Sequence, residues 1–310
     1  MNPLTQEPQT PPARPASKRP DIEGLRLLSA FGIVWFHAGT AGIALAYSGL
    51  VVFLVLSVAL GGRAGRPDGT TLRRRAVRLL RPWLVWFGLY AAFNLARGLP
   101  ALPLEHGLLA GILAGPSIHL WYLPFVFGVL VALDLLRAHV ALRSLSAGAG
   151  LLALLVMAAT HGWRPVSLGL SYPLLQWADA LAPVLVGVFA LGVAQWPRRV
   201  GLAMAAVLVL AAALLAAFDW VGTPYAVGLA ASLGLLLRAP GPARPWSLKL
   251  APLTDCAFGI YLSHSLVFAL LLAHGPELAG GALPAAIFAL ALAGTWGLRR
   301  ALPRVAAYLT

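Results

Sequence analysis

The chain has 310 residues, of which 60% are hydrophobic and only 11% are charged, and its mean hydropathy is +0.82. Soluble domains carry about 25% charged residues, so this composition excludes a soluble globular protein and indicates a polytopic membrane protein. The single cysteine, Cys256, excludes an internal disulfide framework, and no Cys/His cluster suggests zinc. The formal charge of +13 raises the question of nucleic-acid binding, which the positions of the charges answer below.

In chain order, residues 1–20 are Pro-rich and polar, which is typical of a disordered cytoplasmic tail. Residues 21–304 are expected to form one membrane domain, and residues 305–310 a C-terminal cytoplasmic end. The predicted fold is all-α, with about ten transmembrane helices and an interfacial or re-entrant segment at 104–115. The expected spans are 22–45, 47–62, 79–97, 118–137, 140–160, 172–195, 200–218, 221–238, 251–273 and 281–302.

The basic residues support this topology. With ten spans and the N-terminus inside, 21 of the 23 Lys and Arg residues fall on the cytoplasmic side, and only Arg97 and Arg164 fall outside. Glu105, Asp219 and Glu277 all lie on outer loops. The high positive charge therefore follows from membrane topology, which argues against nucleic acid as a partner.

Arg26 and His37 lie within the first expected span, where ionisable side chains are costly and are usually functional. Eleven helical residues at about 100° each return nearly to the same face, and they place the two side chains about 16 Å apart along the axis. An anion-binding group below a titratable group on one stripe predicts a site that extends through part of the membrane.

A basic cluster at residues 73–81 precedes the third span. Arg75 and Arg78 are three residues apart and are expected to share a helix face, a geometry suited to binding phosphates. The alternative is a belt of arginines at the lipid headgroups.

Other candidates lie in later spans. Tyr261 and His264 share a face of the ninth span, although a membrane histidine often serves only a helix–helix hydrogen bond. Asp179, one turn after Gln176, needs a partner at its depth in the sixth span: a histidine, an arginine or water. Trp121 begins the fourth span beside His119 and Tyr122, where an aromatic belt is the simpler interpretation.

These residues are compatible with two functions. One is a proton-coupled transporter of a small polar or sugar-like solute, in which His and Asp relay protons. The other is an intramembrane transferase, in which a histidine deprotonates an acceptor hydroxyl while arginines hold a phosphorylated donor. No convincing internal repeat favours the transporter.

The sequence also resembles the membrane acyltransferase-3 family of acyl-CoA-dependent O-acyltransferases, over residues 21 to about 270. Five elements occur in the family's order. They are Arg26 followed by His37; a Phe53–Ser57 strip in which Val58 replaces the family's glycine; Arg75–Trp83, similar to Arg-x-x-Arg-Leu-Leu-x-Pro-aromatic; His119–Leu123, similar to His-Leu-Trp-Phe-Leu; and Gly259–His264, which ends in Tyr-Leu-x-His.

The resemblance implies transfer of an acyl group, commonly acetyl, from cytoplasmic acyl-CoA to a hydroxyl of a carbohydrate or lipid-linked sugar, without a metal. It also implies a bacterial inner-membrane protein embedded in the lipid bilayer. Some members carry a fused extracytoplasmic esterase-like domain, which is not expected here. The membrane domain would then acylate the acceptor directly, or a separate extracytoplasmic transferase would complete the reaction.

By resemblance, His37 is the essential histidine, acting as a general base or acyl carrier, and Arg26 is its companion. Arg75 and Arg78 match the arginines proposed to meet the CoA phosphates. Ser57, Trp121, Tyr261 and His264 are expected to line the substrate path or to hold helices together, and Asp179 is expected to contact the acceptor on the outer side.

Overall fold

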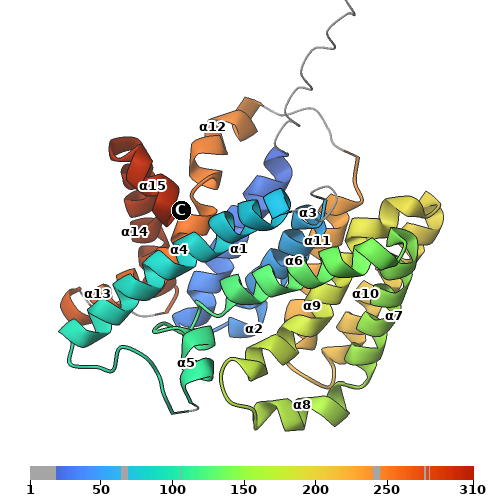
Figure 1. Cartoon of the computed structure of the whole chain (residues 1–310), viewed down its shortest axis with the longest axis horizontal. Coiled ribbons are helices and arrows are strands. Elements are labelled where there is room, and N and C mark those ends of the chain that lie inside the picture. The colour runs from blue at the N-terminus through green and yellow to red at the C-terminus, as the bar shows by residue number, and fades with distance from the viewer. Residues whose placement is uncertain (1–18, 64–68, 106, 240–244, 276, 279) are drawn as a thin grey trace, which may run out of the picture.

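The computed structural model describes residues 19–63, 69–105, 107–239, 245–275, 277–278 and 280–310, and the regular secondary structure in these ranges is helical. Most of the predicted tail, residues 1–18, lies outside this description, as do Arg66 and Arg244. The helices (Figure 1) are α1 Pro20–His37, α2 Ile43–Ala46, α3 Ser48–Gly61, α4 Gly69–Ala96, α5 Leu108–Ala114, α6 Tyr122–His139, α7 Leu142–Ala158, α8 Thr160–Leu168, α9 Leu174–Gly192, α10 Arg198–Leu215, α11 Gly222–Leu236, α12 Pro245–Thr254, α13 Ala257–His274, α14 Ala282–Ala301 and α15 Pro303–Leu309, with a short 3-10 turn at Val193–Gln195.

Within the described residues, six helical segments are long and apolar enough to cross a membrane. They are Ile43–Gly61, Tyr122–His139, Leu174–Gln195, Arg198–Leu215, Ala257–His274 and Ala282–Ala301. The α7–α8 pair passes the same test together but bends by 73°. The all-α prediction is confirmed, and the chain is a multi-pass membrane protein. The charged and polar residues of α1 and α4 lower the hydropathy of these two helices, which are not among the six.

Two of the expected spans are divided. The first, expected at 22–45, ends as α1 at His37, because Gly39 and Gly42 adopt φ values of +65° and +85° that favour glycine and break the helix. The ninth, expected at 251–273, is split between α12 and α13. His37 is consequently the last residue of its helix and adjoins a turn, which leaves its ring free to face other elements.

Helix α3 occupies the centre of the molecule and is apolar around its whole circumference, as expected of a helix that is buried on all sides. It packs against α1, α9 and α11. The approach to α1 is close, since a Cβ on Gly49 would lie only 2.3 Å from the Ser29 carbonyl oxygen. Figure 1 shows α7 and α10 on one side of α3 and α14 on the other.

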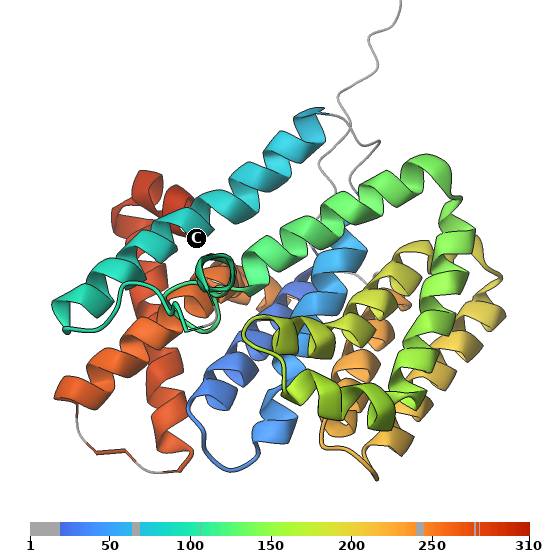
Figure 2. The same cartoon turned by 60° about the horizontal axis from the view of Figure 1, so that its bottom comes forward.

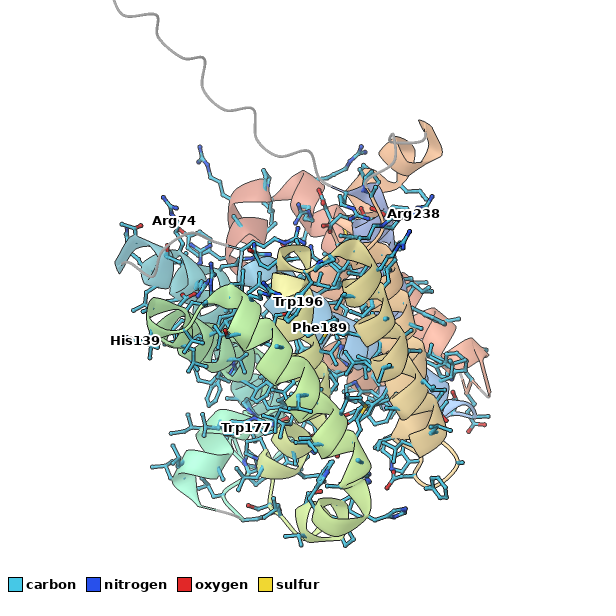
Figure 3. All side chains as sticks on the ribbon, turned by 90° about the vertical axis from the view of Figure 1, so that its right-hand side faces the viewer. Arg74, His139, Trp177, Phe189, Trp196 and Arg238 are labelled. Atoms are coloured by element: carbon cyan, nitrogen blue, oxygen red, sulfur yellow. The ribbon has the colours of Figure 1, made fainter. Side chains whose placement is uncertain are left out.

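Two apolar cores meet at α3. Phe53, Leu54 and Val58 belong to the core shared with α1, α6, α13 and α14, whereas Val51 and Val55 belong to the core shared with α7, α9, α10 and α11. Phe189 of the second core lies inside the bundle in Figure 3. In the turned view of Figure 2, α4 and α6 run obliquely beside the bundle. This arrangement brings the end of α1, the start of α6 and the middle of α13 together.

Candidate active site

Three histidines from distant parts of the sequence meet at the end of α1. His37 is the last residue of α1, His119 lies in the turn before α6, and His264 lies on α13. The ring centroids of His37 and His264 are 4.9 Å apart, those of His119 and His264 are 4.7 Å apart, and those of His37 and His119 are 6.3 Å apart. His119 and His264 are buried, whereas His37 is half-buried. His37 is therefore the most exposed of the three histidines.

A hydrogen bond joins His37 to His264. Nε2 of His264 lies 2.9 Å from Nδ1 of His37, and Nδ1 of His264 lies 2.7 Å from the carbonyl oxygen of Tyr261. A carbonyl oxygen can only accept, so Nδ1 of His264 carries the proton when the ring is neutral. Nε2 of His264 then accepts from Nδ1–H of His37. This chain of bonds leaves Nε2 of His37 as the unprotonated nitrogen.

His119 is held by serines and by the backbone of α13. Its Nε2 lies 3.3 Å from the Leu262 carbonyl, while its Nδ1 lies 3.1 Å from Ser117 Oγ and 3.0 Å from Ser265 Oγ. The same logic places the proton of the neutral ring on Nε2, with Nδ1 accepting from the serines. The Tyr261 hydroxyl also donates to the His119 carbonyl. These hydrogen bonds thus hold the His119 ring against α13.

A cavity of about 310 Å³ adjoins the histidines. Its volume is at the lower end of the range of small-molecule sites, about 300–1,000 Å³. His37 and His119 line it, whereas His264 lies behind His37 and does not. The remaining lining residues are Ile33, Phe36, Tyr47, Leu50, Ile118, Trp121, Tyr122, Arg164, Leu168, Tyr172, Leu175, Gln176, Asp179, Trp220 and Tyr261.

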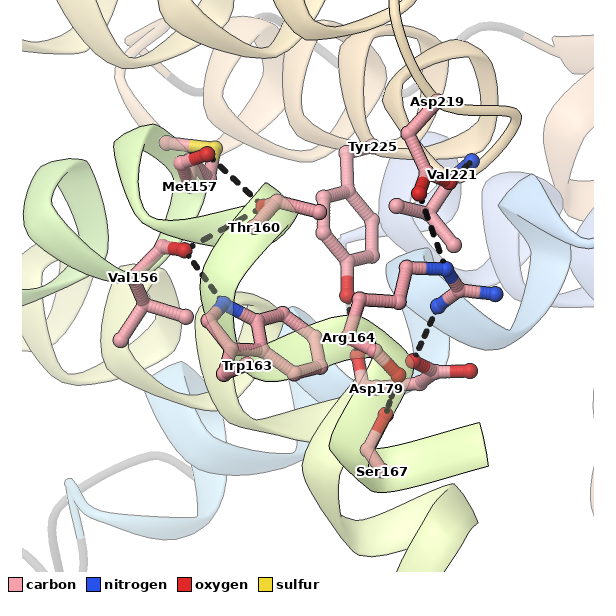
Figure 4. Close-up of polar contacts among 10 residues, drawn as sticks. All are labelled: Val156, Met157, Thr160, Trp163, Arg164, Ser167, Asp179, Asp219, Val221 and Tyr225. Atoms are coloured by element: carbon pink, nitrogen blue, oxygen red, sulfur yellow. Dashed lines mark hydrogen bonds and ion pairs between the residues drawn. The ribbon is translucent and has the colours of Figure 1, made fainter. Parts of the chain in front are cut away.

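A buried ion-pair cluster forms another part of the cavity wall (Figure 4). Arg164 Nη1 lies 2.6 Å from Asp179 Oδ1, and Arg164 Nε lies 3.0 Å from Asp219 Oδ2. The guanidinium also lies 5.3 Å from the ring centroid of Trp220. The Tyr225 hydroxyl donates to the Asp179 carbonyl at 2.5 Å. The partner that the sequence required for Asp179 is thus an arginine.

The position of Arg164 depends on the bend between α7 and α8. Thr160 Oγ1 donates to the Met157 carbonyl at 2.7 Å, and Trp163 Nε1 donates to the Val156 carbonyl at 2.7 Å (Figure 4). Both bonds lie at the break between α7 and α8. The bend turns α8 toward α9, where Arg164 reaches Asp179.

Arg26 and Ser57 lie away from the histidines. Arg26 forms an ion pair with Glu23 at 2.8 Å, one turn earlier on α1. Ser57 Oγ lies 2.8 Å from the hydroxyl of Tyr122, which donates to the Phe53 carbonyl. Tyr122 lines the cavity, so this hydrogen bond connects Ser57 to the cavity wall. Arg26 does not line the cavity.

Arg75 and Arg78 do not present the same surface. Arg75 is buried, pairs with Asp134, and donates to the carbonyls of Leu130 at 3.0 Å and Gly61 at 2.9 Å. Arg78 is exposed. Arg75 thus ties α4 to α6 and to the end of α3, while Arg78 is available to a ligand.

Of the remaining expected residues, Trp121 and Tyr261 are buried and line the cavity. His119 and Arg164 are site residues that the sequence pattern did not predict. His119 stands among aromatic residues typical of a membrane belt. The signal for Arg164 is its place on the outer side, as an exception to the distribution of positive charge. Among the described residues, no group of three or more His, Cys, Asp or Glu side chains is arranged to hold a metal ion.

The chain matches the acyltransferase-3 family model, described as an acyltransferase domain, over residues 19–300. No curated protein and no solved structure matches it significantly. The match covers nearly the whole membrane region, including all three histidines and the Arg164 cluster. The chain therefore belongs to the acyltransferase-3 family and is a multi-pass membrane acyltransferase.

Proposed function

We propose that the enzyme transfers an acyl group, in the first instance acetyl, from cytoplasmic acyl-CoA to a hydroxyl of a carbohydrate or lipid-linked sugar of the cell envelope. It would act in a bacterial inner membrane, with ten spans and both termini in the cytoplasm. The acceptor is acylated by the membrane domain itself or with a separate extracytoplasmic transferase. The observation that carries the proposal is the His37–His264 hydrogen bond at the wall of the cavity.

In this proposal, Nε2 of His37 is the general base. It removes the proton of the acceptor hydroxyl as the hydroxyl oxygen attacks the thioester carbonyl. The new C–O bond forms, the C–S bond breaks, and the CoA thiolate leaves and takes up a proton. His264 touches neither substrate and is a positioning residue, because its Nε2 accepts from Nδ1–H of His37 and so fixes the ring and its tautomer.

On the donor side, we assign the CoA phosphates to Arg78. Its guanidinium is exposed, whereas that of its expected partner Arg75 is engaged by Asp134 and two backbone carbonyls. In the proposed topology Arg26 lies on the cytoplasmic side together with Arg78, where it would supply a second positive charge. The Tyr122–Ser57 pair would then lie between the donor phosphates and the cavity.

Replacing His37 tests the base. We expect His37→Ala to lower acyl transfer by about 10²- to 10⁴-fold, the contribution of a general base, without loss of folded protein. The measurement is incorporation of labelled acetyl from acetyl-CoA into envelope glycans, read by mass spectrometry. His274→Ala is the matched control, because His274 is an exposed histidine at the end of α13. Transfer by purified His37→Ala at the wild-type rate would exclude His37 as the base.

Replacing His264 tests the positioning role. Leucine removes the hydrogen-bond acceptor for His37, whereas glutamine restores one through its amide oxygen. We expect His264→Leu to lower kcat with little change in KM for acetyl-CoA, and His264→Gln to recover part of the loss. Equal kcat values for the two variants would mean that His264 only fills space between α1 and α13.

A further inference from the structure

We infer that Arg164, Asp179 and Asp219 form an acceptor subsite that selects an uncharged polyhydroxylated ring and disfavours an acceptor that carries a carboxylate. The assignment rests on the proposed function for the reaction that follows binding. Three features of the cavity support this binding: the cluster itself, a side-chain amide oxygen without a hydrogen-bond partner among the described residues, and the charges of the lining residues.

The ion pair leaves the Nη2 amino group of Arg164 and one oxygen of Asp179 for a ligand. Arg164 uses Nη1 and Nε for its two carboxylates, and Asp179 uses Oδ1 (Figure 4). Within the part of the chain that the structure describes, Arg164 Nη2 and Asp179 Oδ2 have no hydrogen bond, and both residues line the cavity. A guanidinium only donates and a carboxylate only accepts, whereas each hydroxyl can do both. An adjacent donor and acceptor of this kind match two neighbouring hydroxyls.

Gln176 supplies a second, independent indication. It lies one helical turn before Asp179 on α9 and also lines the cavity. Its Oε1 is buried and has no hydrogen-bond partner among the described residues. A buried acceptor without a partner is unfavourable in a folded protein. A ligand hydroxyl in this part of the cavity would satisfy it.

Aromatic rings complete the subsite. Tyr47 and Trp220 lie edge to face with their centroids 5.4 Å apart, and both line the cavity. Flat apolar faces beside a few polar groups suit a ring that has an apolar face and a polar edge. The cavity wall therefore combines aromatic faces with hydrogen-bonding groups, which suits a pyranose ring better than a linear apolar chain.

The charges favour a neutral ring. Arg164 and Asp179 are the charged residues among those that line the cavity, apart from histidines, and Asp219 adds a second carboxylate behind Arg164. Asp219 is held in place because its Oδ1 accepts from the Val221 amide at 3.0 Å. One guanidinium against two carboxylates leaves a net charge of −1. An acidic ligand would meet like charge in a largely buried site, which is unfavourable.

The test is binding, measured by saturation-transfer-difference NMR on the purified full-length protein in a detergent without sugar headgroups. The probes are the methyl glycosides of glucose, galactose and mannose, each beside its uronate, which differs by one carboxylate. We expect at least one neutral glycoside to bind about tenfold more tightly than its uronate, since like-charge placement is costly. Binding of no glycoside, or equal binding of a glycoside and its uronate, would overturn the inference.

Two variants locate the effect. Asp219→Asn removes one negative charge but keeps the Arg164–Asp179 pair. It should therefore reduce the ratio of the affinity for the glycoside to the affinity for its uronate. Asp179→Asn should weaken binding of the neutral glycoside, because the amide replaces one carboxylate acceptor. The control for charge alone is Glu105→Gln, since Glu105 is exposed and lies outside the cavity lining. The subsite assignment would be wrong if Asp219→Asn left the ratio of glycoside to uronate affinity unchanged. It would also be wrong if Glu105→Gln changed this ratio by the same factor.

The same measurement separates this inference from the transfer proposal. His37→Ala should still bind the neutral glycoside although its acetyl transfer is strongly reduced. If His37→Ala transfers normally while binding depends on Asp179, only the role of His37 is wrong. If transfer needs His37 but no glycoside binds, only the subsite is wrong.

Discussion

Two buried arginines, Arg75 and Arg164, each form an ion pair with a carboxylate, but only the Arg164 pair lines the cavity. Arg75 is 6% exposed and Arg164 is 4% exposed, and each pairs with a carboxylate on another helix. Arg75 donates hydrogen bonds to Asp134 and to two backbone carbonyls. Arg164 faces a cavity, has two carboxylates, and keeps Nη2 unused among the described residues.

The difference lies in what surrounds each guanidinium. Carbonyls at the end of α3 and within α6 close around Arg75, so its pair joins helices and offers little to a ligand. The bend between α7 and α8 leaves space beside Arg164. Arg164 and Asp179 thus line a cavity, whereas Arg75 and Asp134 do not line it.

The largest expected effect is on the free energy of unfolding, when the Arg75–Asp134 pair is broken. Asp134→Ala leaves the Arg75 charge buried without a partner, which should destabilise the fold by about 3–5 kcal/mol. The measurement is the thermal unfolding midpoint of the purified protein. Asp219→Asn is the comparison at the Arg164 cluster, and we expect a smaller loss there, because Asp179 still pairs with Arg164. If both substitutions lowered the unfolding midpoint equally, the Arg75 and Arg164 clusters would have the same structural role.

A smaller effect, on substrate binding, is expected at Arg78. Arg78→Ala should raise KM for acetyl-CoA about tenfold, since a charge-assisted phosphate contact contributes about 1.5–3 kcal/mol. The unfolding midpoint should stay unchanged because Arg78 is exposed. Arg73→Ala is the control, as another exposed arginine of the same helix. If Arg73→Ala raised KM as much as Arg78→Ala, a diffuse basic surface would account for donor binding.

Much of the fold follows from sequence pattern. Apolar runs of about 20 residues predicted the helical membrane domain, and each expected span contains a helix. The division of the first span was not anticipated, because the turn requires the left-handed backbone at Gly39 and Gly42. A hydropathy pattern does not report backbone conformation.

The site was predicted only in part. His37 and His264 were singled out because ionisable residues in a span are costly. His119 and Arg164 were not, since each stands beside aromatic or polar residues that have an ordinary explanation at a membrane surface. Arg75 and Arg78 are three residues apart, yet one is buried and the other exposed, because α6 supplies Asp134 on one side of α4 only.

By itself, the sequence determined the class of the protein, its helices and the residues that are expensive to bury, because these depend on composition and on local period. Tertiary structure decided which of these residues meet. His37 and His264 are 227 positions apart, and only the packing of α1 against α13 places their nitrogens 2.9 Å apart. Hydrogen-bond partners depend on relative helix rotation and bend, which are set by packing across the whole bundle.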